Sequence, residues 1–256
     1  LIPGPSFSTE AAAALLDTTM SEAAHLLDRL AGAHLIERQL PDRYGIHDLL
    51  REYAAEQAQR LDPERARAAA GRLYRLFLDG AEAAARHVPA ALRLPAPEPS
   101  GPVPSAASGI GRSGPDIAGR AAALAWLDAE RANLVGAAVS CAAEGPPEIA
   151  WRLADAMRGY FWVRTDTVDW PTLVRAGHTA ATAASNRAAM ASMEYSLGMC
   201  QIRTNRHTDA LRHLRRAIDL SRVAGWPACE AAALGSLGIA YTELGELRYA
   251  ATQFRE

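Results

Sequence analysis

The chain of 256 residues carries a formal net charge of −2, and its 49% of hydrophobic residues include only 6% aromatic ones. This length can bury more than one module, and an apolar content made mainly of alanine and leucine favours packed helices over sheets. All 27 basic residues are arginines, which excludes a Walker lysine, a Schiff-base lysine and a Ser-Lys dyad from these residues.

Residues 1–62 are predicted to form two short helices, a β-hairpin and a third helix. FSTEAAAALL gives the first helix, and TTMSEAAHLLDRLAGA gives the second, which opens on a Thr19–Glu22 capping box. Two apolar stretches, 35–36 and 44–46, flank a Pro-Asp turn as in a hairpin. This order is typical of a winged helix, and the abrupt start leads us to expect an N-terminally truncated one. The apolar stripe of the second helix is Met20, Ala23, Leu27 and Leu30.

The run RYGIHDLLREY, residues 43–53, places a His-Asp pair where the hairpin gives way to the third helix. We interpret Asp48 as the N-cap of that helix, a role that does not require His47 beside it. No HExxH motif, paired cysteine ligands or GxSxG serine accompanies the pair. We therefore expect neither a catalytic residue nor a metal site, and no enzyme activity in this chain.

A connecting helix is predicted over residues 63–88, because Asp62 followed by Pro63 is an N-cap with proline at the first helical position. One side of this helix carries Leu73, Leu76, Phe77 and Ala84. Residues 89–115 are dense in proline, glycine and serine, which indicates a linker or a long surface loop. Residues 109–114 spell GxGxxG, but no strand precedes them, so we interpret them as linker and not as a dinucleotide site.

Residues 116–256 are predicted to be helical, with a repeat of 40 residues. SLG at 196–198 recurs at 236–238, and at the same offset Leu214 aligns with Phe254 and Asn205 with Gly245. This spacing resembles the tetratricopeptide repeat, in which a small residue on one helix lets the next helix approach. Residues 148–181 form a degenerate earlier copy without the Leu-Gly pair. The predicted fold is mainly all-α: a winged helix with a small β-hairpin, followed by a tetratricopeptide-like α-solenoid that is cut at its C-terminal end.

The distribution of charge separates the two halves of the chain. Residues 1–62 carry five arginines against ten carboxylates, which is poorly suited to binding the phosphates of DNA. Residues 187–226 carry seven arginines against three carboxylates, and we interpret this excess as a docking face for an acidic partner or as a solvated helix face. The candidate partner-binding residues are Arg203, Arg206, Arg212, Arg215 and Arg216.

The cysteines and the hydropathy indicate the compartment. Cys141, Cys200 and Cys229 are odd in number and widely spaced, which fits a reducing cytoplasm. No apolar stretch is long enough to span a membrane, and no signal peptide opens the chain. We therefore expect a cytoplasmic protein.

RYGIHDLLREYA (43–54) and ALAWLDAERANLVGAAV (123–139), followed by the repeats, resemble the C-terminal half of SARP-type regulators (Streptomyces antibiotic regulatory proteins) of the STAND class. The resemblance covers nearly the whole chain. In that family a DNA-binding region precedes an NB-ARC nucleotide switch, whose last piece is a winged helix ending in a Met-His-Asp motif. Ile46, His47 and Asp48 match this motif, with isoleucine in place of methionine.

The resemblance implies that His47 contacts the β-phosphate of bound ADP, with Asp48 as its positioning partner and helix cap. The phosphate-binding loop and the Walker B strand are not in this sequence, so ADP or ATP is implied only for the intact parent protein. The implied partners are the upstream NB-ARC domain of the same chain and an unknown protein or signal ligand on the repeats. Self-association is a further option, while DNA is implied only through parts outside this chain and a membrane is not implied.

Three functions remain open at the level of the sequence. The first is a regulatory and protein-interaction segment, in which the winged helix closes over ADP and the repeats sense a signal or partner. The second is a transcription factor whose winged helix reads DNA directly. The third is a free-standing tetratricopeptide adaptor.

Overall fold

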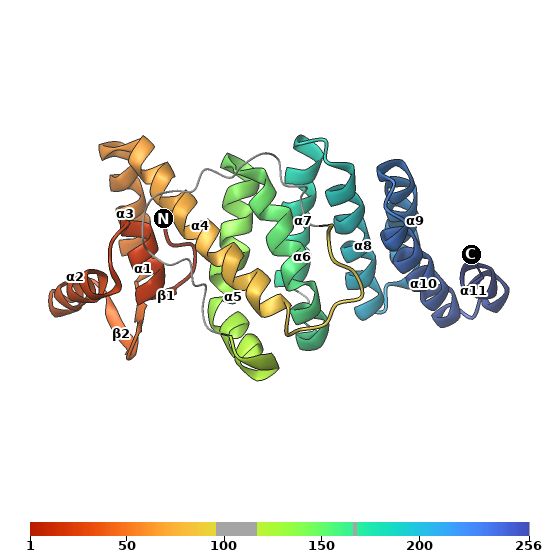
Figure 1. Ribbon diagram of the computed structural model, residues 1–256, viewed down its shortest axis with the longest axis horizontal. Helices are drawn as coiled ribbons and strands as arrows, with labels where there is room; N and C mark the ends of the chain where they lie inside the picture. The colour runs from red at the N-terminus through yellow and green to blue at the C-terminus, as the bar shows by residue number, and fades with distance from the viewer. Residues whose placement is uncertain (96–116, 166–167, 256) are drawn as a thin grey trace.

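The computed structural model describes residues 1–95, 117–165 and 168–255, and it confirms a mainly helical fold (Figure 1). The described residues form eleven helices and one small antiparallel sheet. The N-terminal unit lies at one end of a row of helices, and the C-terminus lies at the other end (Figure 1).

The elements of the N-terminal unit are β1 (Ser6–Ser8), α1 (Thr9–Leu16), α2 (Met20–Gly32), β2 (Glu37–Leu40), β3 (Arg43–Gly45) and α3 (Asp48–Leu61). The helices that follow are α4 (Pro63–Ala85), α5 (Gly119–Glu144), α6 (Pro147–Arg164), α7 (Asp169–Ala183), α8 (Arg187–Arg203), α9 (His207–Ala224), α10 (Pro227–Glu243) and α11 (Leu247–Gln253).

The sheet has the strand order β1-β3-β2, with both pairings antiparallel. The predicted hairpin is confirmed, but its first strand begins at Glu37 and not in the apolar pair 35–36. The strand β1 was not predicted, because three residues are too few to show a period and their partner strand lies more than 30 residues away. Phe7 of β1 stacks on Tyr44 of β3 at 6.2 Å, so the sheet contributes two aromatic rings to the core.

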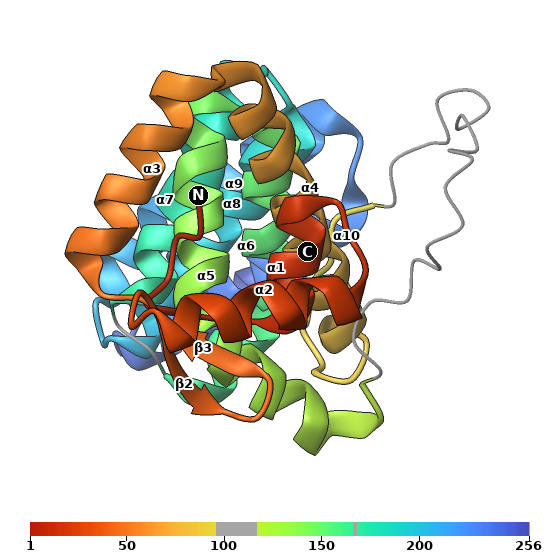
Figure 2. The same cartoon turned by 90° about the vertical axis from the view of Figure 1, so that its left-hand side faces the viewer.

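The helix α2 begins at the predicted cap and buries only part of its predicted stripe. Thr19 accepts a hydrogen bond from the Glu22 amide at 3.3 Å, as expected, whereas the Glu22 carboxylate accepts from the Thr18 hydroxyl. Ala23 and Leu27 are buried against the rest of the unit, but Met20 and Leu30 are exposed. Figure 2 shows α2 and the hairpin together at this end of the molecule.

The helix α4 joins the N-terminal unit to the helices that follow. Asp62 caps it by accepting from the Arg65 amide at 2.9 Å, and Pro63 occupies its first turn, as predicted. Its predicted apolar side is confirmed, since Leu73 and Phe77 are buried, and it packs on α1, α5 and α6. One apolar core therefore runs from the sheet through α4 into α8, so the segment expected only to connect two modules belongs to the core of both.

The turns between the later helices recur every 20 residues. Each has a residue with positive φ at Gly145, Thr165, Ser185, Asn205, Gly225 and Gly245. Four of these turns share the same backbone hydrogen bond. In each, the residue that follows the positive-φ residue donates its amide N–H to the carbonyl five positions earlier, as Arg206 does to Gln201. The period of 40 residues per helix pair is therefore confirmed, and it extends into the pair α6–α7.

Glycines let the paired helices approach closely. A Cβ at Gly198 would lie 2.7 Å from Leu214, and one at Gly238 would lie 2.6 Å from Phe254, so each predicted small-to-large contact is confirmed. In the pair α6–α7 the residue aligned with Gly198 is Arg158. There the close approach comes from Gly177 on the second helix instead, and a Cβ on it would meet Ala154 at 3.2 Å.

The first part of the predicted linker is packed against the helices. Residues 88–95, which we call the strap, form neither helix nor strand, yet Val88 and Leu92 are buried. In Figure 1 this segment runs from the end of α4 across the row of helices toward α8. The rest of the predicted linker, including the GxGxxG run at 109–114, lies outside the described residues.

Candidate functional site

His47 is the N-cap of α3, one residue before the predicted cap. Its backbone is extended, with φ −66° and ψ 139°, and its Nδ1 accepts a hydrogen bond from the Leu49 amide at 3.3 Å. The prediction that Asp48 caps the helix is therefore wrong, because Asp48 already has helical geometry as the first residue of α3. Capping explains why a side chain with an acceptor precedes this helix, but the acceptor is a ring nitrogen and not a carboxylate.

Asp48 is bound by Arg51 and not by His47. Arg51 donates to the Asp48 carboxylate at 2.9 Å and also to the carbonyl of Pro3 at 2.9 Å. Both His47 and Asp48 are exposed. Because Nδ1 of His47 is an acceptor, the neutral ring carries its proton on Nε2, which is an N–H donor at the surface.

The helix α3 leaves an apolar pair uncovered next to His47. Leu49 is 71% exposed and Tyr53 is 61% exposed, and residues four apart lie on the same helix face. No described side chain of α3 is fully buried, and the helix packs mainly on α4. Figure 2 shows α3 along the outer edge of the molecule.

A buried ion pair joins the sheet to α5. Arg43 of β3 donates to the Glu130 carboxylate at 2.5 Å, and their side chains are only 13% and 5% exposed. Arg43 also donates to the carbonyl of Ala129 at 2.6 Å and to the hydroxyl of Ser6 at 3.0 Å. The strand that leads into His47 is thereby fixed to the first long helix after α4.

Asn133 completes this junction one helical turn later. Its carbonyl oxygen accepts from the Gly4 amide at 2.8 Å, and its amide group donates to the Ser6 carbonyl at 2.9 Å and to Glu130 at 2.6 Å. A side chain at Gly4 would clash with Asn133. The sequence alone did not reveal this junction, because the contacts that join α5 to the sheet and to the residues before it link positions more than 80 residues apart.

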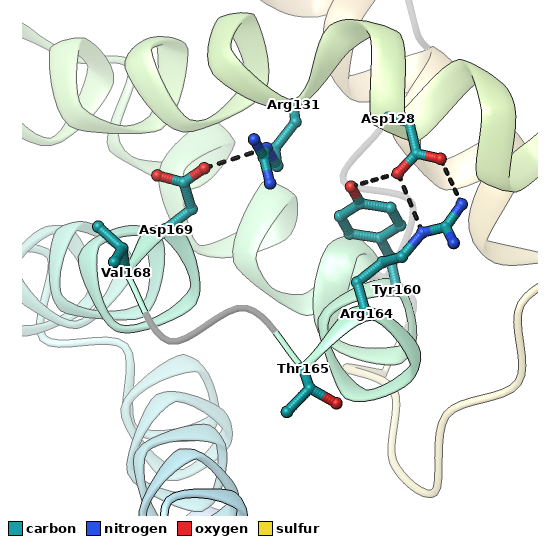
Figure 3. Close-up of a pocket in the computed structure, with 7 residues that line it drawn as sticks. All are labelled: Asp128, Arg131, Tyr160, Arg164, Thr165, Val168 and Asp169. Atoms are coloured by element: carbon teal, nitrogen blue, oxygen red, sulfur yellow. Dashed lines mark hydrogen bonds and ion pairs between the residues drawn. The ribbon is translucent and has the colours of Figure 1, made fainter.

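The opposite polar face of the same motif holds α6 and α7. Asp128 accepts from the Tyr160 hydroxyl at 2.7 Å and pairs with Arg164, while Arg131 pairs with Asp169 at 3.1 Å (Figure 3). These residues line an open groove of about 620 Å³. Burial, and then the neighbouring Asp128, raise the pKa of Tyr160. Since these charged groups bind one another, we interpret the groove as a structural clamp and not as a ligand site.

The five candidate partner-binding arginines do not share one face. Arg203 lies over the Trp162 ring at 4.9 Å, and Arg206 pairs with Asp209 at 2.6 Å. The other three lie on α9: Arg212 approaches His213, Arg215 donates to the Tyr241 hydroxyl on α10, and Arg216 pairs with Glu194 on α8. Arg215 and Arg216 point to different neighbours because successive helical residues are about 100° apart. A role for these arginines in docking a partner stays a prediction.

Glu194 is a buried carboxylate held by basic groups from two helices. It is 3% exposed and lies 3.0 Å from His178 on α7, 2.8 Å from His213 and 3.1 Å from Arg216. Burial opposes ionisation, but the hydrogen bonds from His178 and His213 outweigh it and lower the pKa of Glu194 to about 2. The carboxylate is therefore charged at neutral pH and ties α7, α8 and α9 together.

The three cysteines are free and buried. Burial raises the pKa of Cys141 and of Cys229 to about 12 and raises that of Cys200 as well, so these thiols are unreactive at neutral pH. Within the described ranges no three His, Cys, Asp or Glu side chains are placed to hold a metal ion. None of the described helices is long and apolar enough to cross a membrane.

Two curated proteins are similar to this chain. The Regulatory protein AfsR of Streptomyces griseus is 33% identical over 226 residues, which are 88% of this chain and 22% of that protein. The Regulatory protein AfsR of Streptomyces coelicolor is 39% identical over 83 residues, which are 30% of this chain and 8% of that protein. The chain thus spans about a fifth of the length of the first relative. No protein-family model matches the chain, and no solved structure matches it.

Proposed function

We propose that this chain is the regulatory and partner-binding segment of a bacterial transcriptional regulator of the SARP and STAND type. Its similarity to the Regulatory protein AfsR over 88% of its length supports a regulator. We assign the N-terminal unit to a winged helix, a reading supported by its strand order β1-β3-β2 around α1 and α2. We assign the helix pairs to tetratricopeptide-like repeats, a reading supported by their 40-residue period and their glycine contacts.

The observation that carries the proposed nucleotide role is the hydrogen bond from the Leu49 amide to Nδ1 of His47. It orients the ring and leaves the Nε2–H donor directed away from the helix. A phosphate at this point would accept from Nε2 and would lie near the positive N-terminal end of α3. Arg51 neutralises Asp48, which would otherwise repel a phosphate.

The exposed face of α3 supports a docked nucleotide domain as the partner in the same chain. Leu49, two residues after His47, and Tyr53 form an uncovered apolar pair. An apolar pair beside a phosphate donor is the arrangement expected where a second domain closes over a nucleotide. In this proposal α3 forms one wall of the pocket, and the rest of the pocket comes from the nucleotide domain of the full-length protein.

The charges on the surface of α2 do not favour direct DNA binding by this helix. Asp28 of α2 pairs with Arg38 of β2, and the same carboxylate accepts from the Tyr44 hydroxyl at 3.3 Å. Arg38 is therefore engaged within the unit, and Arg29 of α2 itself is outnumbered by the carboxylates Glu22 and Asp28 of the same helix. A helix that carries carboxylates and whose neighbouring cation is already paired offers little to DNA phosphates.

The ADP content of the purified full-length protein tests this proposal. His47→Ala is expected to lower the molar ratio of ADP to protein and to raise basal transcriptional activity, because one hydrogen bond to a charged phosphate is worth roughly 1.5–3 kcal/mol. His25→Ala is the matched control, since His25 is an exposed histidine of the same unit. Equal ADP content in the His47 and His25 variants would refute the nucleotide role.

A further inference from the structure

The strap is held by its backbone as well as by its side chains. Arg158 of α6 donates to the carbonyl of Leu92 at 2.5 Å, and the amide of Leu94 donates to the carboxylate of Asp155 at 3.1 Å. The two strap residues are two apart, which is the spacing at which an extended chain presents backbone groups to the same side. Asp155 and Arg158 thus act as one acceptor and one donor for the backbone of the strap.

Asp155 and Arg158 are also held by contacts with side chains of α6 and α8. Asp155 and Arg158 pair with each other at 2.8 Å, and Ser192 of α8 binds both. Arg158 also donates to the hydroxyl of Ser196 at 2.8 Å and lies over the Tyr195 ring at 5.5 Å. Its side chain is 4% exposed, so the guanidinium is fixed in place in a nearly dry site.

The side chains of the strap are anchored at two positions. Leu92 is 4% exposed and belongs to the apolar cluster that includes Ala191 and Tyr195 of α8. Arg93 donates to four carbonyls: those of Asp155 and Ala156 at 2.7 and 2.9 Å, and those of Ala85 and Val88 at 3.1 and 3.0 Å. By contrast, Ala91, which lies between the buried residues Val88 and Leu92, is exposed.

We propose that the face formed by α6 and α8 is a peptide-binding site, and that the strap occupies it as an intramolecular ligand. The ligand class is an extended peptide segment with a leucine, an arginine and a second leucine in succession. A partner that carries such a segment binds by displacing the strap. This inference rests on the proposed partner-binding role of the helix pairs, and it identifies the face of α6 and α8 as the place where a partner binds.

Exchange of one peptide for another is physically easier than emptying the site. Without an occupant, Arg158 and Asp155 would keep their mutual ion pair, but each would lose the hydrogen bond that the strap now supplies. An incoming peptide restores both bonds, because every non-proline residue offers the same carbonyl and amide. The tethered strap competes at an effective concentration on the order of 1 mM, so it weakens but does not prevent binding in trans.

Fluorescence anisotropy with the full 256-residue chain and a labelled synthetic peptide, VPAALRLP, tests the proposal. The double variant Leu92→Ser/Arg93→Ser, which removes both anchors of the strap, is expected to bind the peptide at least ~10-fold more tightly than the wild type. Ala91→Ser is the matched control and should bind as the wild type does. A peptide N-methylated at the leucine equivalent to Leu94 lacks the N–H for Asp155, and it should bind the double variant at least ~10-fold more weakly than the unmodified peptide.

Hydrogen exchange of the wild-type chain tests whether the peptide displaces the strap, without any substitution in the strap. Excess unmodified peptide is expected to accelerate exchange of the Leu94 amide, because displacement exposes it, and the same concentration of the N-methylated peptide should accelerate it less. A folded double variant that binds no peptide, or a Leu94 amide whose exchange is unchanged by excess peptide, would overturn the proposal. These assays contain no nucleotide and the ADP assay contains no peptide, so the failure of one proposal is distinguishable from the failure of the other.

Discussion

His47 makes a local contact as the cap of one helix, whereas Glu194 makes long-range contacts that join three helices. The sequence motif identified His47, but it placed the cap on Asp48, because the reach of an imidazole to the first-turn amides depends on its rotamer. Glu194 was not identified, since its partners His178 and His213 come from other helices and each is an ordinary helical residue in the sequence. The role of a single titratable residue such as Glu194 can be inferred only once the fold shows which charged groups lie next to it.

Glu194 is expected to make the protein sensitive to acid. Its folded pKa of about 2 lies below the ordinary value of 4.5, so its stabilising contribution is present above pH 4.5 and is lost as the pH falls from 4.5 toward 2. A shift of this size corresponds to about 3 kcal/mol. Urea unfolding between pH 7 and pH 2.5 should show a steeper loss for the wild type than for Glu194→Gln. Parallel curves for the two proteins would contradict the prediction.

At the scale of the elements, the repeated helices were predictable from the sequence and the strap was not. The glycine and its large partner recur within one helix pair, so their spacing is a local signal, as Gly198 and Leu214 show. The strap lies in a segment whose composition predicts a linker, and its conformation is imposed by Arg158 and Asp155, more than 60 residues later. The strand β1 was missed for the same reason, since its order comes from β3 and Asn133.

The close contact at Gly198 predicts opposite effects for two glycine substitutions in neighbouring helices. Gly198→Ala is expected to destabilise the protein by about 1–3 kcal/mol, because the new Cβ would lie 2.7 Å from Leu214. Gly235→Ala is the matched control: no atom lies within 4 Å of the added Cβ, so alanine should stabilise α10 by about 0.5–1 kcal/mol. Chemical denaturation measures both, and a stabilising Gly198→Ala would show that the helices can separate without cost.

At the scale of the whole molecule, the junction between the sheet and α5 joins the N-terminal unit to the row of helices. Arg43 is three residues before Ile46 in the strand that leads to His47, and it is fixed to Glu130. The strand that leads to His47 is therefore fixed to α5, whose other polar face holds α6 and α7. The sequence predicted two modules, but their mutual packing rests on long-range contacts that no local pattern records.

Breaking the junction is expected to cost far more than breaking an exposed pair. Glu130→Ala leaves the largely buried Arg43 without its counter-charge and should destabilise the protein by about 3–5 kcal/mol. Glu56→Ala removes an exposed pair with Arg60 and should change stability by less than about 0.5 kcal/mol. Thermal unfolding compares the two variants. Adding Arg43→Met to Glu130→Ala should recover part of the loss, and similar midpoints for the two single variants would argue against a buried junction.

The rate at which ADP leaves the full-length protein tests the central claim most directly. His47→Asp keeps an N-cap acceptor for α3 but has no N–H to donate, so it separates capping from phosphate binding. We predict that ADP dissociates at least ~10-fold faster from His47→Asp than from the wild type, while the thermal stability of the protein is unchanged. An ADP dissociation rate equal to that of the wild type would show that His47 caps a helix and does nothing more.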